Sequence, residues 1–248
     1  MKHLIPIFTM WASAMVLAEE PPKAAPGITA VDPASLVSGS KITLKMRGFH
    51  LKEATGITFP KAGGVTAEIK EKKDSAAPAG FDNKFAGDTE LLAEISVPAE
   101  FPAGLLEYVI ATPAGAAAGK FPVLASATAI EEKEPNNGFR EAQILAAGQV
   151  VRGNIGADKD VDVYQFPAKA GQALKVSVTG GSPLLMDATL QCYDARGQFL
   201  AAIDDATTRD PVLTFTPVVD GPVLLCVSDA HDKGGVWHSY WLTVEETK

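Results

Sequence analysis

Apolar and polar positions alternate along most of this chain, which is the pattern of β-strands. Between residues 41 and 47, Ile42, Leu44 and Met46 take every second position, and polar residues stand between them. A period of two places these three side chains on one buried face of a strand. Similar short runs in the first half cover residues 55–59, 65–69, 91–97, 105–111 and 120–124.

Turn residues separate these runs at the spacing of a β-sandwich, so we predict an immunoglobulin-like sandwich over residues 28–125. Residues 126–133 are small and charged and are interpreted as a linker. Strand patterns return after Gly148 and predict a second, jelly-roll-like sandwich over residues 134–248. Its runs cover residues 149–155, 161–166, 173–178, 188–193, 198–203, 212–215, 223–227 and 239–244. The predicted fold class is therefore all-β, with two β-sandwich domains in series.

Two segments depart from the alternating pattern. Residues 70–88 show neither a strand nor a helical period, and we expect them to form a long solvated loop. Residues 134–147 contain a Pro-Asn-Asn turn followed by Phe139, Ala142 and Ile144, and they are the one place where we expect a helix.

The first 18 residues have the composition of an export signal peptide. Lys2 precedes an apolar run over residues 4–17, and Val16 and Ala18 fit the cleavage positions. The run is shorter than the ~20 residues that cross a membrane, which disfavours an anchor. Residues 19–27 are Pro-rich and are interpreted as a tether. We therefore expect a periplasmic or extracellular protein that is not inserted in the membrane after the signal is removed.

Composition narrows the classes of function further. The 248 residues are 46% hydrophobic, with 22 basic against 30 acidic residues and a formal net charge of −8. This apolar fraction is typical of globular domains, and an acidic chain without a basic stripe argues against nucleic acid as a partner. The only cysteines, Cys192 and Cys226, invite a disulfide in an exported protein. Cys192 shares a strand face with Leu190, whereas Cys226 lies opposite Leu225, and this pattern weighs against the bridge.

Catalysis finds little support in the sequence. After the predicted signal, the histidines are His50, His231 and His238, and the chain has no Gly-x-Ser-x-Gly motif around a nucleophile. Phosphate-binding Gly-rich loops and zinc-type Cys/His spacings do not occur either. We therefore predict a protein that is not an enzyme and has no catalytic residues.

The densest group of oxygen-bearing side chains stands where the second sandwich begins. Ca²⁺ takes six to eight oxygen ligands, which a linker and a loop can supply together. In the alternative interpretation, Asn136 and Asn137 cap a helix and the acidic residues are solvated turn residues. The candidate calcium ligands are Glu132, Glu134, Asn136, Asn137, Asp158, Asp160 and Asp162. A further acidic set in the turns of the same sandwich is a weaker candidate and comprises Asp187, Asp194, Asp204, Asp205 and Asp210.

Aromatic residues near the C-terminus form a second candidate site. Trp237, Tyr240 and Trp241 cluster behind a Gly-Gly pair, and exposed aromatics on a sandwich edge stack on sugars or anchor a protein partner. Alternation assigns Tyr240 to the core. Trp237 and Trp241 are the candidate ligand-binding residues.

The second half resembles the bacterial pre-peptidase C-terminal (PPC) domain. The resemblance is carried by Glu-Pro-Asn-Asn at residues 134–137 and by Asp-Val-Asp-Val-Tyr-Gln-Phe at residues 160–166. It continues through further Gly, Asp and apolar positions up to Val244. Similar domains in bacterial collagenases hold calcium with acidic and Asn residues at this linker, so the resemblance implies Ca²⁺ as the candidate cofactor. The first half is similar to IPT/TIG-type immunoglobulin-like domains through Val31-Asp32-Pro33, Gly48-Phe49 and the Thr-Pro-Ala-Gly turn at residues 112–115.

Together these features predict an exported, non-catalytic binding or accessory protein that recognises a protein or polysaccharide of the envelope or matrix. PPC domains often accompany secreted proteases, which gives the alternative of an accessory or chaperone-like protein that acts with a separately encoded peptidase. A hydrolase with an unrecognised site is the third hypothesis.

Overall fold

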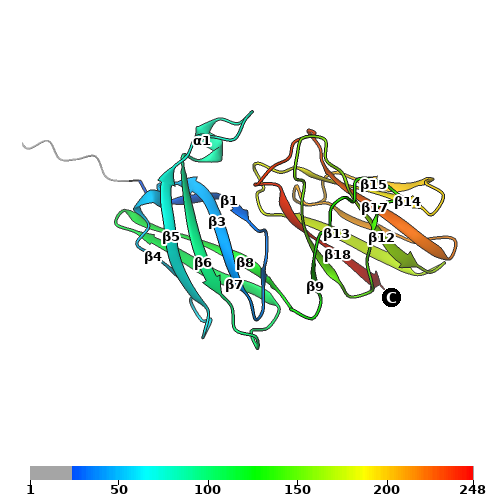
Figure 1. The fold of residues 1–248 in the computed structure, drawn as a ribbon, viewed down its shortest axis with the longest axis horizontal. Helices are drawn as coiled ribbons and strands as arrows, with labels where there is room; N and C mark the ends of the chain where they lie inside the picture. The colour runs from blue at the N-terminus through cyan, green and yellow to red at the C-terminus, as the bar shows by residue number, and fades with distance from the viewer. Residues whose placement is uncertain (1–23, 248) are drawn as a thin grey trace, which may run out of the picture.

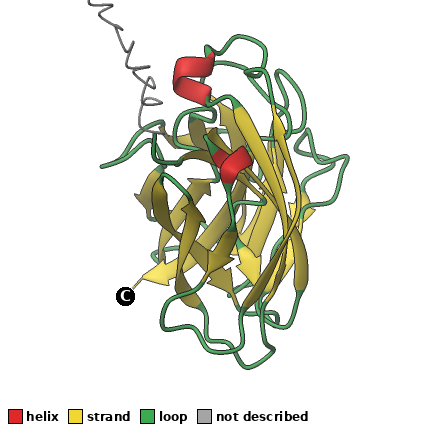
Figure 2. Ribbon diagram, turned by 90° about the vertical axis from the view of Figure 1, so that its left-hand side faces the viewer, coloured by secondary structure: helices red, strands yellow, loops and turns green. Residues whose placement is uncertain are grey.

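The computed structural model describes residues 24–247, and apart from two short helical turns its regular elements there are β-strands. The predicted export signal and most of the predicted tether lie outside the described residues. Figure 1 shows two strand-rich bodies side by side, with β9 (Ala129–Glu131) where the chain passes from one to the other. The helical structure of the described residues is limited to Leu51–Glu53 and Asn83–Ala86 (Figure 2). The prediction of an all-β fold is confirmed.

The first body draws all its strands from the first half of the chain. Its sheets have the orders β1-β3-β6-β5 and β2-β8-β7-β4, and their inner faces enclose one core. As the alternation predicts, Leu44 and Met46 are fully buried in this core. Its elements are β1 (Gly27–Asp32), β2 (Leu36–Val37), β3 (Lys41–Phe49), the 3₁₀ turn η1 (Leu51–Glu53), β4 (Gly56–Thr58), β5 (Thr66–Asp74), α1 (Asn83–Ala86), β6 (Thr89–Ser96), β7 (Gly104–Thr112) and β8 (Gly115–Leu124).

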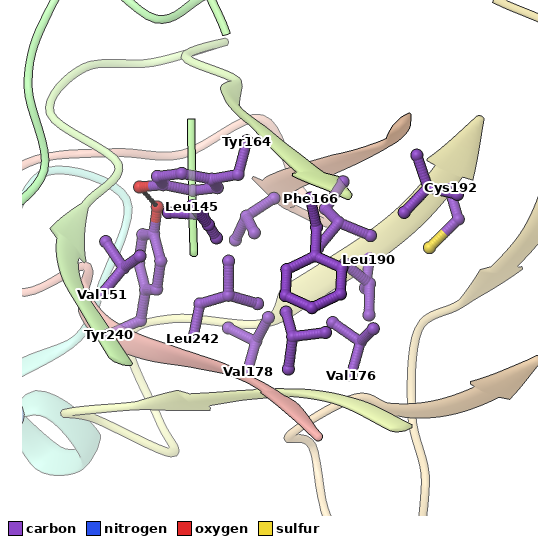
Figure 3. Packing of buried hydrophobic residues seen from close by; sticks show 14 of the residues in the cluster. Leu145, Val151, Tyr164, Phe166, Val176, Val178, Leu190, Cys192, Tyr240 and Leu242 are labelled. Atoms are coloured by element: carbon purple, nitrogen blue, oxygen red, sulfur yellow. Dashed lines mark hydrogen bonds between the residues drawn. The ribbon is translucent and has the colours of Figure 1, made fainter. Parts of the chain in front are cut away.

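The second body is built from the strands that follow. Its sheets have the orders β16-β13-β18-β11-β9 and β10-β12-β17-β14-β15, and a single large apolar cluster lies between them (Figure 3). Its elements are β9 (Ala129–Glu131), β10 (Gln143–Ile144), β11 (Val150–Asn154), β12 (Asp162–Ala168), β13 (Ala173–Gly180), β14 (Ala188–Asp194), β15 (Phe199–Ile203), β16 (Val212–Phe215), β17 (Gly221–Asp229) and β18 (Ser239–Thr247).

Two local predictions are wrong. Residues 70–88 are not one long loop. β5 continues to Asp74 and stays paired with β6, and Asp82 caps α1 by accepting a hydrogen bond from the Lys84 amide at 3.0 Å. Residues 134–147 are not a helix. The Asn136 carbonyl accepts from the Val163 amide at 2.9 Å, and β10 pairs with β12. Hydrogen bonds to the neighbouring strand therefore take the place of helical ones in this segment.

The two cysteines are free thiols that face opposite sides of one sheet. Cys192 is part of the main core, whereas Cys226 packs with Val163 and Leu224 on the outer face. The pattern that weighs against a disulfide is thus confirmed, since neighbouring strands present these positions to different faces.

The two sandwiches contact each other directly. The Val31 amide donates to the Gly181 carbonyl at 3.0 Å, and Ser182 Oγ donates to the Thr29 carbonyl at 2.9 Å. A Cβ on Gly181 would collide with the Val31 carbonyl, so glycine is needed for this close approach. Among residues 24–247, no helix is long and apolar enough to cross a membrane.

Candidate metal centre

Three segments of the second sandwich bring oxygen-bearing side chains together at its entrance. The chain leaves β9 with the Glu132 amide bonded to the Arg152 carbonyl of β11 at 2.9 Å, which fixes where the Glu132 side chain lies. Asp162 begins β12, which lies in the opposite sheet. Carboxylate oxygens of Glu132, Glu134 and Asp162 all lie within 4.8 Å of one another.

Glu132 is the hub of this group. Its Oε1 accepts hydrogen bonds from Asn136 Nδ2 and from the Tyr164 hydroxyl, both at 2.9 Å, and its Oε2 accepts from the Asn154 amide at 2.8 Å. Glu134 is exposed, and its Oε2 accepts from the Asn136 amide at 2.9 Å. These bonds tie the segment after β9 to β11 and β12.

Two tyrosines connect Glu132 to Asp162 through the end of the core. Tyr164 Oη lies 2.6 Å from Tyr240 Oη, and Tyr240 donates to Asp162 Oδ2 at 2.6 Å (Figure 3 draws the contact between the hydroxyls). Gly153 makes room for them, because a Cβ there would collide with the Tyr240 ring. Burial raises the pKa of both phenols, so both keep their protons.

The two phenols do not have enough protons for all three contacts in this series. The contacts Glu132–Tyr164, Tyr164–Tyr240 and Tyr240–Asp162 each need a proton, and the two phenols supply one apiece. With both carboxylates ionised, one contact has no proton. Either a carboxyl carries the missing proton, or a cation neutralises Asp162 and leaves Tyr240 free to donate to Tyr164.

Asp162 and Asn136 are fully buried, and each has one oxygen without a partner. Oδ1 of Asp162 and Oδ1 of Asn136 make no hydrogen bond within the described part of the chain. Burial first, and then the neighbouring Glu132 carboxylate, raise the pKa of Asp162 to about 9. A buried oxygen without a partner is costly and calls for a ligand, an ion or water.

The residues present fit Ca²⁺. The carboxylates of Glu132, Glu134 and Asp162, with the amide oxygen of Asn136, are hard oxygen donors of the type that Ca²⁺ requires. The two buried oxygens without partners are part of this set. These residues would hold the ion, and the ion would supply positive charge where the carboxylates converge.

Of the other three predicted ligands, Asp158 and Asp160 bond to groups outside the carboxylate group. Asn137 is exposed, and Asp160 accepts from the Gly156 and Val161 amides, so it caps its own turn. Asp158 pairs with Lys233 at 3.2 Å, and a hydrogen bond from that lysine lowers the pKa of Asp158. The alternative in which Asn136 and Asn137 cap a helix is wrong as well, because no helix follows them.

The weaker acidic set is divided by the fold. Carboxylate oxygens of Asp187, Asp204 and Asp205 lie within 4.8 Å of one another. Asp194 instead accepts from the Arg196 and Gln198 amides in its own turn, and Asp210 accepts from the Gly180 amide.

The two aromatic candidates for ligand binding, Trp237 and Trp241, differ in their exposure. Trp237 is only 5% exposed and packs with Ala30, Ala86 and Leu185 between the two sandwiches. Trp237 is therefore not an exposed ring on which a ligand could stack, because the first sandwich covers it. Trp241 is half-buried and lines an open cleft, and Tyr240 is in the core as predicted.

Sequence reasoning missed the parts that Tyr164, Tyr240 and Asn154 take in this site. A signal for the tyrosines was present, because a phenol at a strongly buried strand position needs a partner for its hydroxyl. Asn154 gave no signal, since its amide reaches Glu132 through a strand pairing that the local sequence does not encode.

Comparison with known proteins relates the second sandwich to a described domain family. Residues 160–228 match the family model of the bacterial pre-peptidase C-terminal domain, which confirms the resemblance found in the sequence. This domain is a non-catalytic one that typically accompanies secreted proteases. The resemblance of the first sandwich to IPT/TIG domains stays a prediction.

The proteins similar to this chain include two proteases and a domain of a collagenase. A probable subtilase-type serine protease of Deinococcus radiodurans is 34% identical over 109 residues, which cover 41% of this chain and 15% of that protein. Among solved structures, the pre-peptidase C-terminal domain of a Bacillus anthracis collagenase is matched over its whole length and 46% of this chain, at 18% identity and a TM-score of 0.37. The secreted serine protease VesC of Vibrio cholerae is matched over 48% of its chain and 90% of this one, at 10% identity and a TM-score of 0.28.

Proposed function

We propose that this chain is an exported, non-catalytic accessory protein whose second sandwich binds Ca²⁺ at its entrance and recognises a protein or polysaccharide outside the cytoplasm. The observation that carries the calcium part is the convergence of Glu132, Glu134 and Asp162 around buried oxygens that have no partner. The accessory role is supported by the match to a domain that typically accompanies secreted proteases.

In this proposal the ion fixes the direction in which the chain enters the second sandwich. Glu132 and Glu134 belong to the entering segment, whereas Asp162 begins β12. Bound Ca²⁺ would neutralise carboxylates that otherwise repel one another and would join that segment to the sheet. The relation of the two sandwiches would then be stiffer with calcium than without it.

A second candidate keeps the same fold but names a partner enzyme. The curated relative is a protease, and the aligned region spans only 15% of it. A chain that acts beside a separately encoded secreted peptidase would explain the shared domain.

Thermal unfolding of residues 19–248 with Ca²⁺ and with excess chelator tests the calcium site. A ligand that binds only the folded state adds ~2.7 kcal/mol at 100 times its Kd, which raises Tm by several degrees. We expect Glu134→Gln to reduce this rise, because it removes a charge while the amide oxygen can still accept from the Asn136 amide.

Glu131→Gln is the matched control. Glu131 is exposed and pairs with Arg152 outside the carboxylate group, so calcium should still stabilise this variant. A wild-type Tm that is the same in calcium and in chelator would refute the site.

A further inference from the structure

A cleft of about 470 Å³ opens between the two sandwiches on the side of β1 and β8. One wall is formed by β1 and the other by residues 117–122 of β8, and Gly180, Gly181 and Trp241 of the second sandwich close one end. Tyr108, stacked on Phe121 with ring centroids 4.1 Å apart, forms part of the floor. The volume is in the range of ligand pockets, which occur preferentially at domain interfaces.

The β8 wall of this cleft is a strand edge with unused hydrogen-bonding groups. On one side β8 pairs with β7 over its whole length, from Gly115 to Val123. On the other side β2 pairs only with Val123 and Leu124. Within residues 24–247, no strand pairs with this side of β8 between Gly115 and Pro122. The stretch is bounded by β2 at one end and by Ala25, which lies against Gly115, at the other.

Pro122 shows which amides face the cleft. Proline has no N–H, so its nitrogen in the β7–β8 ladder must point away from β7. Backbone groups alternate along a strand, so the amides of Lys120, Ala118 and Ala116 point outward with it. These amides are free to bond to a further strand.

Comparison with the edge of the other sheet shows that this opening is unprotected. β5 ends its sheet with Lys70, Lys72 and Lys73 and has a register shift between Ile69 and Glu71, two features that block edge pairing. The free stretch of β8 instead begins Gly-Ala-Ala-Ala-Gly, and only Lys120 and Pro122 at its far end are of the protective type. Small side chains let another backbone come close.

The cleft offers few polar side chains for a sugar. Lys120 pairs with Glu107 at 3.7 Å, Asp210 accepts from the Gly180 amide, and Thr29 bonds to the Arg47 and Ala86 carbonyls. The lining also has apolar side chains, among them Trp241 and Leu105, which is 67% exposed. Backbone groups on one wall and apolar side chains around them suit an extended peptide, whose main chain supplies the matching donors and acceptors.

We infer that this cleft binds an extended, predominantly apolar peptide segment of a partner protein, which adds to β8 as an edge strand. The inference deepens the proposed binding role by naming the class of partner. It does not depend on calcium, because the cleft and the carboxylate group share no residue.

Panning a library of linear twelve-residue peptides against residues 19–248 tests this inference, and the enriched peptides are then measured singly. We expect Ala118→Pro to weaken them about tenfold or more, since it removes one edge hydrogen bond and blocks the approach of the strand. Ala118→Ser keeps the amide and should bind like the wild type. When a peptide binds, hydrogen exchange should slow at the amides of Ala116 and Ala118. Trp241→Ala should also weaken peptide binding.

Several outcomes would overturn the inference. These are no enriched peptide, peptides that bind Ala118→Pro as well as the wild type, or glycans that bind through Trp241 in a parallel array. Binding that appears only after residues 19–23 are removed would assign the cleft to this chain's own leading segment. The calcium shift in Tm, measured on the same samples, shows separately whether the proposed metal site holds.

Discussion

Arg47 in the first sandwich and Asp162 in the second are both buried ionisable residues, but the chain surrounds them differently. Arg47 donates to Glu90 Oε1 at 2.8 Å, to the Ser75 hydroxyl, and to the carbonyls of Ala76, Ala86 and Gly87. Asp162 accepts one hydrogen bond from Tyr240 on Oδ2, and its Oδ1 has no partner.

The difference separates a structural role from a binding role. A buried charge with all its donors bonded holds together the segments that it contacts, here β3 and the chain on both sides of α1. A buried carboxylate that lacks partners is costly to keep unless something else supplies them. We therefore look for a ligand at Asp162 and not at Arg47.

The largest effect is expected at Arg47. Arg47→Met removes the charge that pairs with Glu90 and leaves several carbonyls without their donor, which should cost about 3–5 kcal/mol of unfolding free energy. Urea unfolding measures this. Lys45→Met is the control. Lys45 is exposed, and its ammonium lies as far as 3.9 Å from the nearest Asp32 oxygen, so losing this weak pair should cost less than about 1 kcal/mol. Equal costs would contradict the contrast.

Asp162→Asn is expected to abolish the stabilisation by calcium while leaving the stability without calcium nearly unchanged. The substitution removes a carboxyl that burial makes hard to ionise, as its raised pKa shows, so in chelator the unfolding free energy should stay within about 1 kcal/mol of the wild type or rise. The added ~2.7 kcal/mol at 100 times the wild-type Kd should disappear, because the ion loses a charged ligand. Unfolding in calcium and in chelator checks both arms. A variant that is severely destabilised in chelator would make Asp162 structural, like Arg47.

The smallest effect is expected at His238, another buried group without hydrogen-bond partners. Burial lowers the pKa of His238, and this outweighs the opposing charges of Asp229 and Asp158. The unfolded chain therefore takes up a proton before the folded one, so stability should fall as pH decreases below ~6.5 toward the lower pKa of the folded state.

Replacing His238 with Gln should flatten this acid-side slope, measured by unfolding at pH values between ~7 and ~5. His231→Gln is the control, because that side chain is 71% exposed and its pairing with Asp187 spans 3.6 Å. An unchanged slope in His238→Gln would show that other groups cause the acid sensitivity.

Most strands of this protein could be predicted from the sequence. A period of two marks which side chains a strand buries, and this local property was sufficient to place the strand from Lys41 and the opposite facing of Cys192 and Cys226. The Asp-rich start of β12 and the Glu-Pro-Asn-Asn segment likewise indicated both the domain and the carboxylate group.

Only the tertiary structure decided the rest, because partners distant in sequence have no local signature. Pairing between β12 and its neighbours replaced the helix expected over residues 134–147, and the approach of the first sandwich buried Trp237. The series from Glu132 through Tyr164 and Tyr240 to Asp162 joins residues of β12 and β18 to the segment after β9. The free edge of β8 depends on where β2 stops pairing. Alternation determines which face of a strand is buried, whereas the assembled sheets determine what that face meets.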